Sequence, residues 1–109
     1  MGIKLTNNAV AFVPSAVSST QTTLTVTAGK GALFPILGAT DYFYATLSDV
    51  SNNFEIVKVT ARTDDVMTMV RAQESTLAIP FAANSRFEHR ITAATILAII
   101  DETDDYLLL

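Results

Sequence analysis

Three strand-like segments between Tyr42 and Thr76 constrain the fold of this chain more than any other feature. The segment reads YFYATLSDVSNNFEIVKVTARTDDVMTMVRAQEST, in which β-branched and aromatic residues alternate with short runs of Ser, Asn and Asp. Val, Ile, Thr, Tyr and Phe favour extended strands, whereas Asn and Asp favour the reversed backbone of tight turns. Neighbouring strands joined by turns this short pair antiparallel. The segment therefore predicts an antiparallel meander.

Alternation within the first of these strands predicts which side chains face the core. Phe43, Ala45 and Leu47 form an apolar side. Because successive side chains of a strand point to opposite faces, Tyr42 and Tyr44 fall on the other side. We expect these two tyrosines to be surface or interface groups.

The second and third strands carry charged residues and methionines whose placement is less obvious. In the second strand the better core face starts with Glu55, which we expect at its rim, and consists of Glu55, Val57, Val59 and Ala61. In the third, Met67 and Met69 could face the core or a protein partner, and core placement is favoured. Arg71 and Glu74 lie around the following bend, so we expect them to pair weakly there.

Further elements are predicted on both sides of the meander. Ala9–Val13 is a short apolar run that Pro14 ends, and in the TTLTVT segment Leu24 and Val26 alternate with threonines. Segment 86–91 returns as a strand, and Thr92 is a good N-cap for a helix over residues 93–102. The sequence thus predicts a mainly β fold. We expect one small antiparallel β-sandwich or barrel-like domain over residues 9–102, closed by one short C-terminal helix.

The segment AGKGALFPILGA at residues 28–39 is expected to be a packed loop. Its apolar residues are too many to be left in water; they are Leu33, Phe34, Ile36 and Leu37. The alternative is that Gly29-Lys30-Gly31 cradles a phosphate. That alternative is disfavoured because the spacing matches neither the dinucleotide-binding nor the P-loop pattern.

Both chain ends are predicted to make contacts outside the domain. Residues 1–8 are interpreted as an N-terminal arm whose partners lie elsewhere, with another subunit as one candidate. The apolar residues of the predicted helix cover much of its circumference, which suggests burial by a second molecule. Residues 103–109 are interpreted as a docking tail, because three leucines at a chain end invite association; folding back over the chain's own sheet is the alternative. The predicted interface residues are Tyr42, Tyr44, Ile99, Ile100, Tyr106, Leu107, Leu108 and Leu109.

Composition excludes several function classes. The chain has 109 residues, half of them apolar, and no cysteine, so one domain without disulfides or thiolate chemistry is expected. Its seven basic residues are scattered among eleven acidic ones, which argues against a nucleic-acid partner. No apolar run approaches the roughly 20 residues that span a bilayer, and the first residues do not resemble a secretory signal. We therefore expect a soluble protein, with no membrane partner, made in a cytoplasm.

No catalytic or metal-binding pattern is present. His89 is the single histidine, and no serine lies in a nucleophile-elbow context. The Asp64-Asp65 and Asp104-Asp105 pairs lack the spaced ligands and turn glycine of a calcium loop. We expect neither enzymatic activity nor a metal, a cofactor or a small-molecule substrate.

The amino-acid sequence of the meander is similar to that of a module found in tailed-bacteriophage virion proteins. In that module an aromatic strand precedes an "EIVKVT" strand and a "TLTVVRGQEGT" hairpin. Here Ala72 and Ser75 stand where glycines are common, which puts the tightness of this bend in doubt. The resemblance covers most of residues 20–95. Its matching positions are 34–35, 37–38, 42–47, 55–62, 70–71, 73–74, 76, 81–83, 86 and 91–93.

The resemblance implies a small β-domain that serves as a structural protein of the virion. The expected place is the tail side, where such domains join fibre or baseplate parts to the tail. The alternative is a capsid decoration (cement) protein that stabilises the head shell. The small size of the chain favours this alternative. In both cases the expected partners are other phage virion proteins and copies of the same chain, as a trimer or hexamer. A host-directed binding module is disfavoured because no pocket or charged patch is evident.

Overall fold

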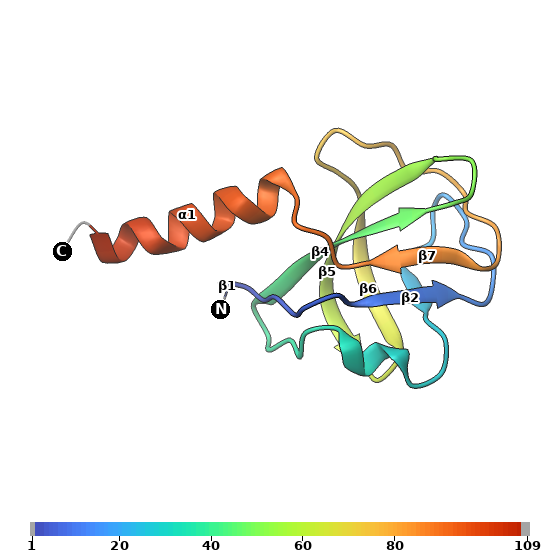
Figure 1. The fold of residues 1–109 in the computed structure, drawn as a ribbon, viewed down its shortest axis with the longest axis horizontal. Helices are drawn as coiled ribbons and strands as arrows, with labels where there is room; N and C mark the ends of the chain where they lie inside the picture. The colour runs from blue at the N-terminus through green and yellow to red at the C-terminus, as the bar shows by residue number, and fades with distance from the viewer. Residues whose placement is uncertain (1, 108–109) are drawn as a thin grey trace.

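A computed structural model of the protein describes residues 2–107, with the side chains of residues 103–107 excepted (Figure 1). The described chain forms a seven-stranded sheet, one 3-10 helix and one α-helix. The strands are β1 (Gly2–Ile3), β2 (Val10–Val13), β3 (Thr23–Thr25), β4 (Asp41–Ser48), β5 (Phe54–Thr63), β6 (Val66–Gln73) and β7 (Ser85–Glu88); the helices are η1 (Lys30–Leu33) and α1 (Ala93–Leu107). The mainly β prediction with one C-terminal helix is confirmed.

The sheet curls into a nearly closed barrel. Its strand order is β2-β7-β4-β5-β6-β3, and every neighbouring pair in this order is antiparallel. The two edges approach each other where Thr27, just after β3, donates from its backbone N to the carbonyl O of Phe12 in β2 over 2.9 Å. Because the edges meet, few strand groups are left exposed for pairing with other chains.

Alternation along the strands fills the barrel, as predicted. Phe43, Ala45 and Leu47 are fully buried, and so are Met67 and Met69. The methionines therefore belong to the core and not to a surface contact. Their strand neighbours Val66 and Val70 point outward and are partly exposed.

Aromatic rings occupy the middle of this core. Phe34, from the loop before β4, stacks on Phe43 with ring centroids 5.9 Å apart and lies 5.2 Å from the ring of Phe87. The packed-loop prediction is thus confirmed for Phe34, and Leu37 packs partly against the same cluster. It is wrong for Leu33 and Ile36, which are 44% and 82% exposed.

Two register shifts interrupt the pairing of β5 with β6. One lies between Ile56 and Lys58, and the other between Val59 and Ala61. A bulge inserts an extra residue and changes which face later side chains occupy. Ala61 is consequently exposed, although strict alternation assigned it to the core with Val57 and Val59.

Two of the three glycines of the 28–39 loop, Gly29 and Gly31, do bind an anion, and the anion is a side chain of the same protein. The backbone N atoms of Gly29 and Gly31 donate to the two carboxylate oxygens of Asp65 over 3.0 and 2.8 Å. These hydrogen bonds lower the pKa of Asp65. A Cβ on Gly31 would collide with the backbone O of Asp64, so the loop and the β5–β6 turn pack as closely as their backbones allow.

Both chain ends differ from their predicted arrangement. Gly2 and Ile3 form β1, which pairs in parallel with Asp41 and Tyr42 at the start of β4 of the same chain. Helix α1 extends beyond residue 102, so the backbone of residues 103–107 continues the helix. The helix leaves the barrel and projects from it, which gives the molecule its long axis of 48 Å against 28 and 23 Å (Figure 1).

Candidate interaction surface

A buried carboxylate organises one end of the barrel. Glu55 lies on the core face of β5 as predicted, at the start of the strand, and it is fully buried. Its two oxygens accept hydrogen bonds from Arg71 Nε and Nη2 over 2.7 and 2.8 Å, and from the backbone N atoms of Ala72 and Ile79 over 2.9 and 3.1 Å. Burial by itself raises the pKa of Glu55, but these hydrogen bonds outweigh burial and lower it. The carboxylate is therefore a charged structural centre.

Arg71 completes this centre by binding three loop carbonyls. Its Nη1 donates to the O atoms of Ser18 and Gln21 over 2.6 and 2.8 Å, and its Nη2 donates to the O atom of Ile79 over 2.8 Å. The predicted pair between Arg71 and Glu74 is wrong, because the guanidinium turns inward to Glu55. One ion pair thus joins β5, β6 and two connecting loops.

The bend after β6 has a left-handed backbone at three residues. Ala72, Glu74 and Ser75 have φ values of 56°, 51° and 66°. Non-glycine residues adopt such angles at a cost, and the surrounding contacts must hold them there. Thr76 supplies one of these contacts, since its Oγ1 accepts from Ile56 N over 3.1 Å and donates to Gln73 O over 2.7 Å.

The same bend holds the start of helix α1. Glu74 Oε1 accepts a hydrogen bond from the backbone N of Ala94 over 2.9 Å. Thr92 acts as the predicted N-cap, because its Oγ1 accepts from Thr95 N over 3.2 Å. A carboxylate and a hydroxyl at a helix N-terminus satisfy amides that have no partner within the helix. The direction in which α1 leaves the barrel is therefore fixed at its base.

Most of the apolar surface of α1 is exposed. The exposed fractions are 50% for Ile96, 62% for Leu97, 38% for Ile99 and 49% for Ile100. Thr95 lies opposite Leu97 and Ile100 and is fully buried; Ile99, four positions after Thr95, is nearer to this side and is the least exposed of the four. On the same side Glu102 Oε2 accepts from Ile3 N over 3.3 Å. The helix therefore turns a polar side toward its own barrel and an apolar side toward solvent.

A groove continues this apolar side at the base of the helix. It has a volume of about 490 Å³ and lies between the 74–76 bend, β5 and residues 90–93. Its apolar walls include Phe54 and Ile91, which are 55% and 65% exposed, together with Ile56 and Ala93. Ala93 precedes Ile96, Leu97 and Ile100 by three, four and seven positions. Residues at this spacing share one face of a helix, so groove and helix form one apolar surface.

The predicted interface tyrosines lie on β4, where Tyr42 pairs with Ile3 of β1. The rings of Tyr42 and Tyr44 meet edge to face with centroids 5.7 Å apart, and Lys58 Nζ lies 4.5 Å above the Tyr42 ring. Burial, then the charges of Glu102 and Asp101, raise the pKa of Tyr42. Both tyrosines are half-buried, so they form a flank of the surface. The predicted positions Tyr106 and Leu107 lie on the helix backbone without a described side chain, and Leu108 and Leu109 lie outside the described residues.

His89 makes contacts typical of a structural histidine. Its ring centroid lies 5.1 Å from that of Phe43, and Nδ1 is 3.5 Å from Thr6 Oγ1. Burial lowers the pKa of His89, which favours the neutral form. Among residues 2–102, whose side chains are described, no group of three or more His, Asp or Glu residues is placed to hold a metal ion. Within the described chain no helix is long and apolar enough to span a membrane.

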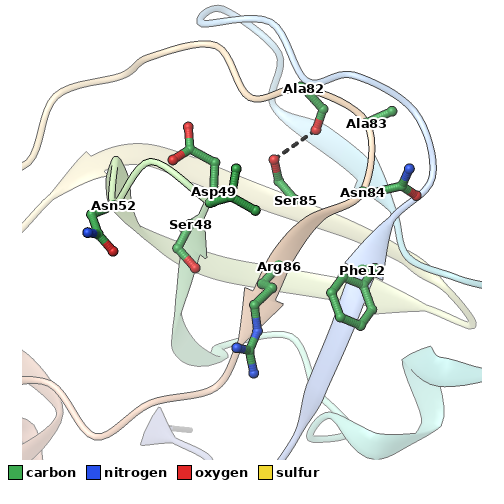
Figure 2. A pocket seen from close by; sticks show the side chains of 10 residues that line it. Phe12, Ser48, Asp49, Asn52, Ala82, Ala83, Asn84, Ser85 and Arg86 are labelled. Atoms are coloured by element: carbon green, nitrogen blue, oxygen red, sulfur yellow. Dashed lines mark hydrogen bonds between the residues drawn. The ribbon is translucent and has the colours of Figure 1, made fainter.

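A second depression, of about 390 Å³, lies between the β4–β5 turn and the start of β7 (Figure 2). Its polar residues already serve the fold. Asp49 accepts from the backbone N atoms of Ser51 and Asn53 over 2.9 and 3.0 Å, and Ser85 Oγ donates to Ala82 O over 2.8 Å. The depression therefore lacks a set of polar groups aimed at a ligand.

Comparison with known proteins gives no relative: no family model matches this chain, and no curated protein matches it. The exposed apolar surface that combines the groove with α1 is the strongest candidate site in the described chain. Sequence reasoning found its helix part through Ile99 and Ile100. It missed Phe54 and Ile91, because nothing local in the sequence indicates that the first residue of a strand and a linker residue meet in space.

Proposed function

We propose that this protein is a structural component of a tailed-bacteriophage virion, a tail-side adaptor that joins fibre or baseplate parts through protein–protein contacts. The observation that carries the proposal is the projecting helix α1, whose large apolar side chains Ile96, Leu97 and Ile100 are about half exposed or more. Exposed apolar surface of this extent is typical of sites that bind other proteins.

The geometry of the bend adds support for the phage module. Ala72 and Ser75, which stand where the module commonly has glycine, both have positive φ. This is the conformation that glycine adopts without strain. The backbone of this chain is therefore compatible with glycine at both positions, as in the "RGQEGT" sequence of the module. Glu55 and Arg71, which belong to the matching positions, meet in the same unit.

The rigidity of the barrel suits an adaptor. The ion pair of Glu55 and Arg71 joins loops on both sides of the sheet, and Glu74 connects this unit to the first turn of α1. A force applied to the helix would be transmitted to the sheet through the contact of Glu74 with Ala94. Such a component contributes contact area, repeated by the symmetry of the particle, and no chemical step.

The protein content of purified virions tests the proposal. A tail-side adaptor is expected at a few to a few dozen copies per particle on a stained gel calibrated against the major capsid protein. Capsid decoration, which small size favours, predicts instead a copy number close to that of the major capsid protein. Absence of the protein from infectious particles would overturn both assignments.

A further inference from the structure

The apolar surface formed by the groove and α1 can be assigned an occupant. It presents five large side chains that are more than a third exposed, Phe54, Ile91, Ile96, Leu97 and Ile100, with Ile99 at its edge. An exposed apolar patch of this kind is typical of sites that bind other proteins. The patch begins in a concave groove and continues along a straight helix face. An elongated apolar segment, such as another helix, fits this shape.

Charge is distributed unequally along α1. Residues 93–100 are uncharged, whereas Asp101, Glu102, Asp104 and Asp105 follow in the second half, and the helix contains no basic residue. Acids near a helix C-terminus are unfavourable because that end already carries partial negative charge. A parallel bundle of several copies would bring these acidic segments side by side. A partner that offers positive charge at the far end of the helix would relieve them.

The base of α1 offers such charge. Glu88 forms ion pairs with both Arg86 and Arg90, so this cluster carries one more positive than negative charge. The side chain of Arg90 is half exposed and lines the groove. The partial positive charge of the helix N-terminus lies at the same place. Glu74 lines the same groove, so these four side chains carry no net charge, and the half-exposed guanidinium of Arg90 is the positive group that the groove offers to the acidic end of α1.

A two-fold arrangement brings these ends together. Residues 93 and 107 lie seven positions on either side of Ile100, and both belong to α1. If two helices pair antiparallel about Ile100, residue 107 of one copy lies level with residue 93 of the other, at the groove. The sequence there, Tyr106 followed by three leucines, is apolar. The two barrels then lie at opposite ends of the helix pair.

Glu74 lines the same groove and is incompletely satisfied. Its Oε1 accepts from Ala94 N, but its Oε2 is buried and has no hydrogen-bond partner within the described chain. A buried acceptor without a partner is costly. A donor supplied by a second copy would remove this cost, and the phenol of Tyr106 is the side-chain donor in the segment that the arrangement delivers.

We propose that two copies associate through antiparallel α1 helices, so that the acidic and apolar C-terminal segment of each lies in the groove at the base of the other. The proposal rests on the proposed function for its place in a particle, and it names a partner for the same surface. Each copy contributes both a groove and a segment, which is how a contact approaches the roughly 800 Å² per partner of a stable interface. Such a contact closes a dimer, and with a three-fold contact elsewhere it yields a hexamer.

Mass measurement by light scattering and sedimentation tests association. The full chain is expected at twice its 11.7 kDa. Leu97→Asp is expected to weaken association by roughly a hundredfold, because each two-fold dimer loses two buried leucines. Val50→Asp is the matched control, since Val50 is fully exposed in the β4–β5 turn, and it is expected to leave the mass unchanged. A monomer at all accessible concentrations would overturn the proposal.

Disulfide formation tests the direction of pairing, because the natural chain has no cysteine. Mixed Ala93→Cys and Leu107→Cys variants are expected to cross-link to each other, and Ile100→Cys to itself. Cross-linking of Ala93→Cys to itself would indicate parallel helices and overturn the proposal, as would capture of a different virion protein by a chain that stays monomeric. A dimer that is absent from virions would overturn only the proposed function.

Discussion

The barrel and helix α1 differ in how completely they satisfy their own groups. Inside the barrel, the charged pair of Glu55 and Arg71 is buried with two hydrogen bonds between its members and five to the backbone. On α1, the apolar residues Ile96 and Leu97 are half exposed or more. The barrel hides a charge that normally stays in water, and the helix exposes apolar groups that normally leave water. The comparison teaches that the barrel pairs its buried charges within one chain, whereas α1 leaves large apolar side chains exposed on its surface.

The largest effect is expected when the charge centre of the barrel is broken. Arg71→Leu leaves the Glu55 carboxylate buried without its partner and removes the donor to three loop carbonyls. Removing one member of a buried pair costs about 3–5 kcal/mol. We expect a loss of this size in the free energy of unfolding from urea titration. Arg86→Leu, which removes a half-exposed arginine, should cost less than about 1 kcal/mol. Equal costs for the two variants would show that the barrel does not depend on this centre.

A second effect concerns the close approach of two loops. Gly31→Ala places a Cβ against the backbone O of Asp64, and neither backbone can move without disturbing the carboxylate of Asp65. Overpacking of this kind costs about 2–3 kcal/mol. Gly29→Ala in the same loop meets no atom within 4 Å, although its φ is +83°. It should cost only about 1 kcal/mol, from the left-handed backbone. Thermal unfolding of the two variants, measured in parallel, distinguishes the cost of the steric collision in Gly31→Ala from the cost of the left-handed backbone in Gly29→Ala.

The contrast between barrel and helix also explains what the sequence could predict. Alternation alone assigned Phe43, Ala45 and Leu47 to the core, because a strand with one buried face leaves a period of two. Alternation could not predict which residues pair with the charged side chains. Glu55 finds Arg71 through a hairpin whose register contains two shifts, and such shifts are set by tertiary packing. Glu55 among alternating valines was nevertheless a signal, since an acid on a core face requires a buried partner.

The chain ends show the same limit. The run of acids after Ile100 resembles a solvated tail, yet the backbone continues as helix to Leu107. Ile3 N donates to Glu102 Oε2, so the two ends of the described chain meet. A contact between residues so far apart in sequence cannot be read from local patterns. The exposed apolar face of the helix could be predicted, because its residues cover more of the circumference than packing on one side requires.

Acid should weaken the barrel through Glu55. Its pKa lies below the ordinary value of 4.5, because hydrogen bonds from Arg71, Ala72 and Ile79 outweigh burial. A lowered acid pKa contributes stability above the unfolded pKa, and that stability is lost as pH falls through the folded pKa. The free energy of unfolding should therefore decrease from about pH 5 towards about pH 3. Glu55→Gln should give a less steep decrease. An unchanged slope would assign the acid sensitivity to other carboxylates, such as Asp65.

A smaller effect of opposite sign is expected at the bend after β6. Ala72→Gly and Ser75→Gly remove side chains from residues with φ of 56° and 66°. Relief of left-handed strain, reduced by the greater freedom of glycine in the unfolded chain, should stabilise the protein by roughly 0.5–1 kcal/mol per site. Ala82→Gly, in the loop before β7, is a control that should not stabilise. Destabilisation by both bend variants would mean that the side chains contribute contacts that outweigh the strain.

The smallest effect on folding should come from the most apolar surface of the molecule. Leu97→Ser changes a side chain that is 62% exposed in the isolated chain, so little buried area is lost. At protein concentrations low enough to keep the chain monomeric, we expect a change below about 0.5 kcal/mol in the free energy of unfolding. At high concentration the wild-type protein should gain stability from association while the variant does not, because binding to the folded state alone stabilises it by mass action. A large loss at low concentration would mean that Leu97 already packs within its own chain, and the distinction between a complete barrel and an incomplete helix would then fail.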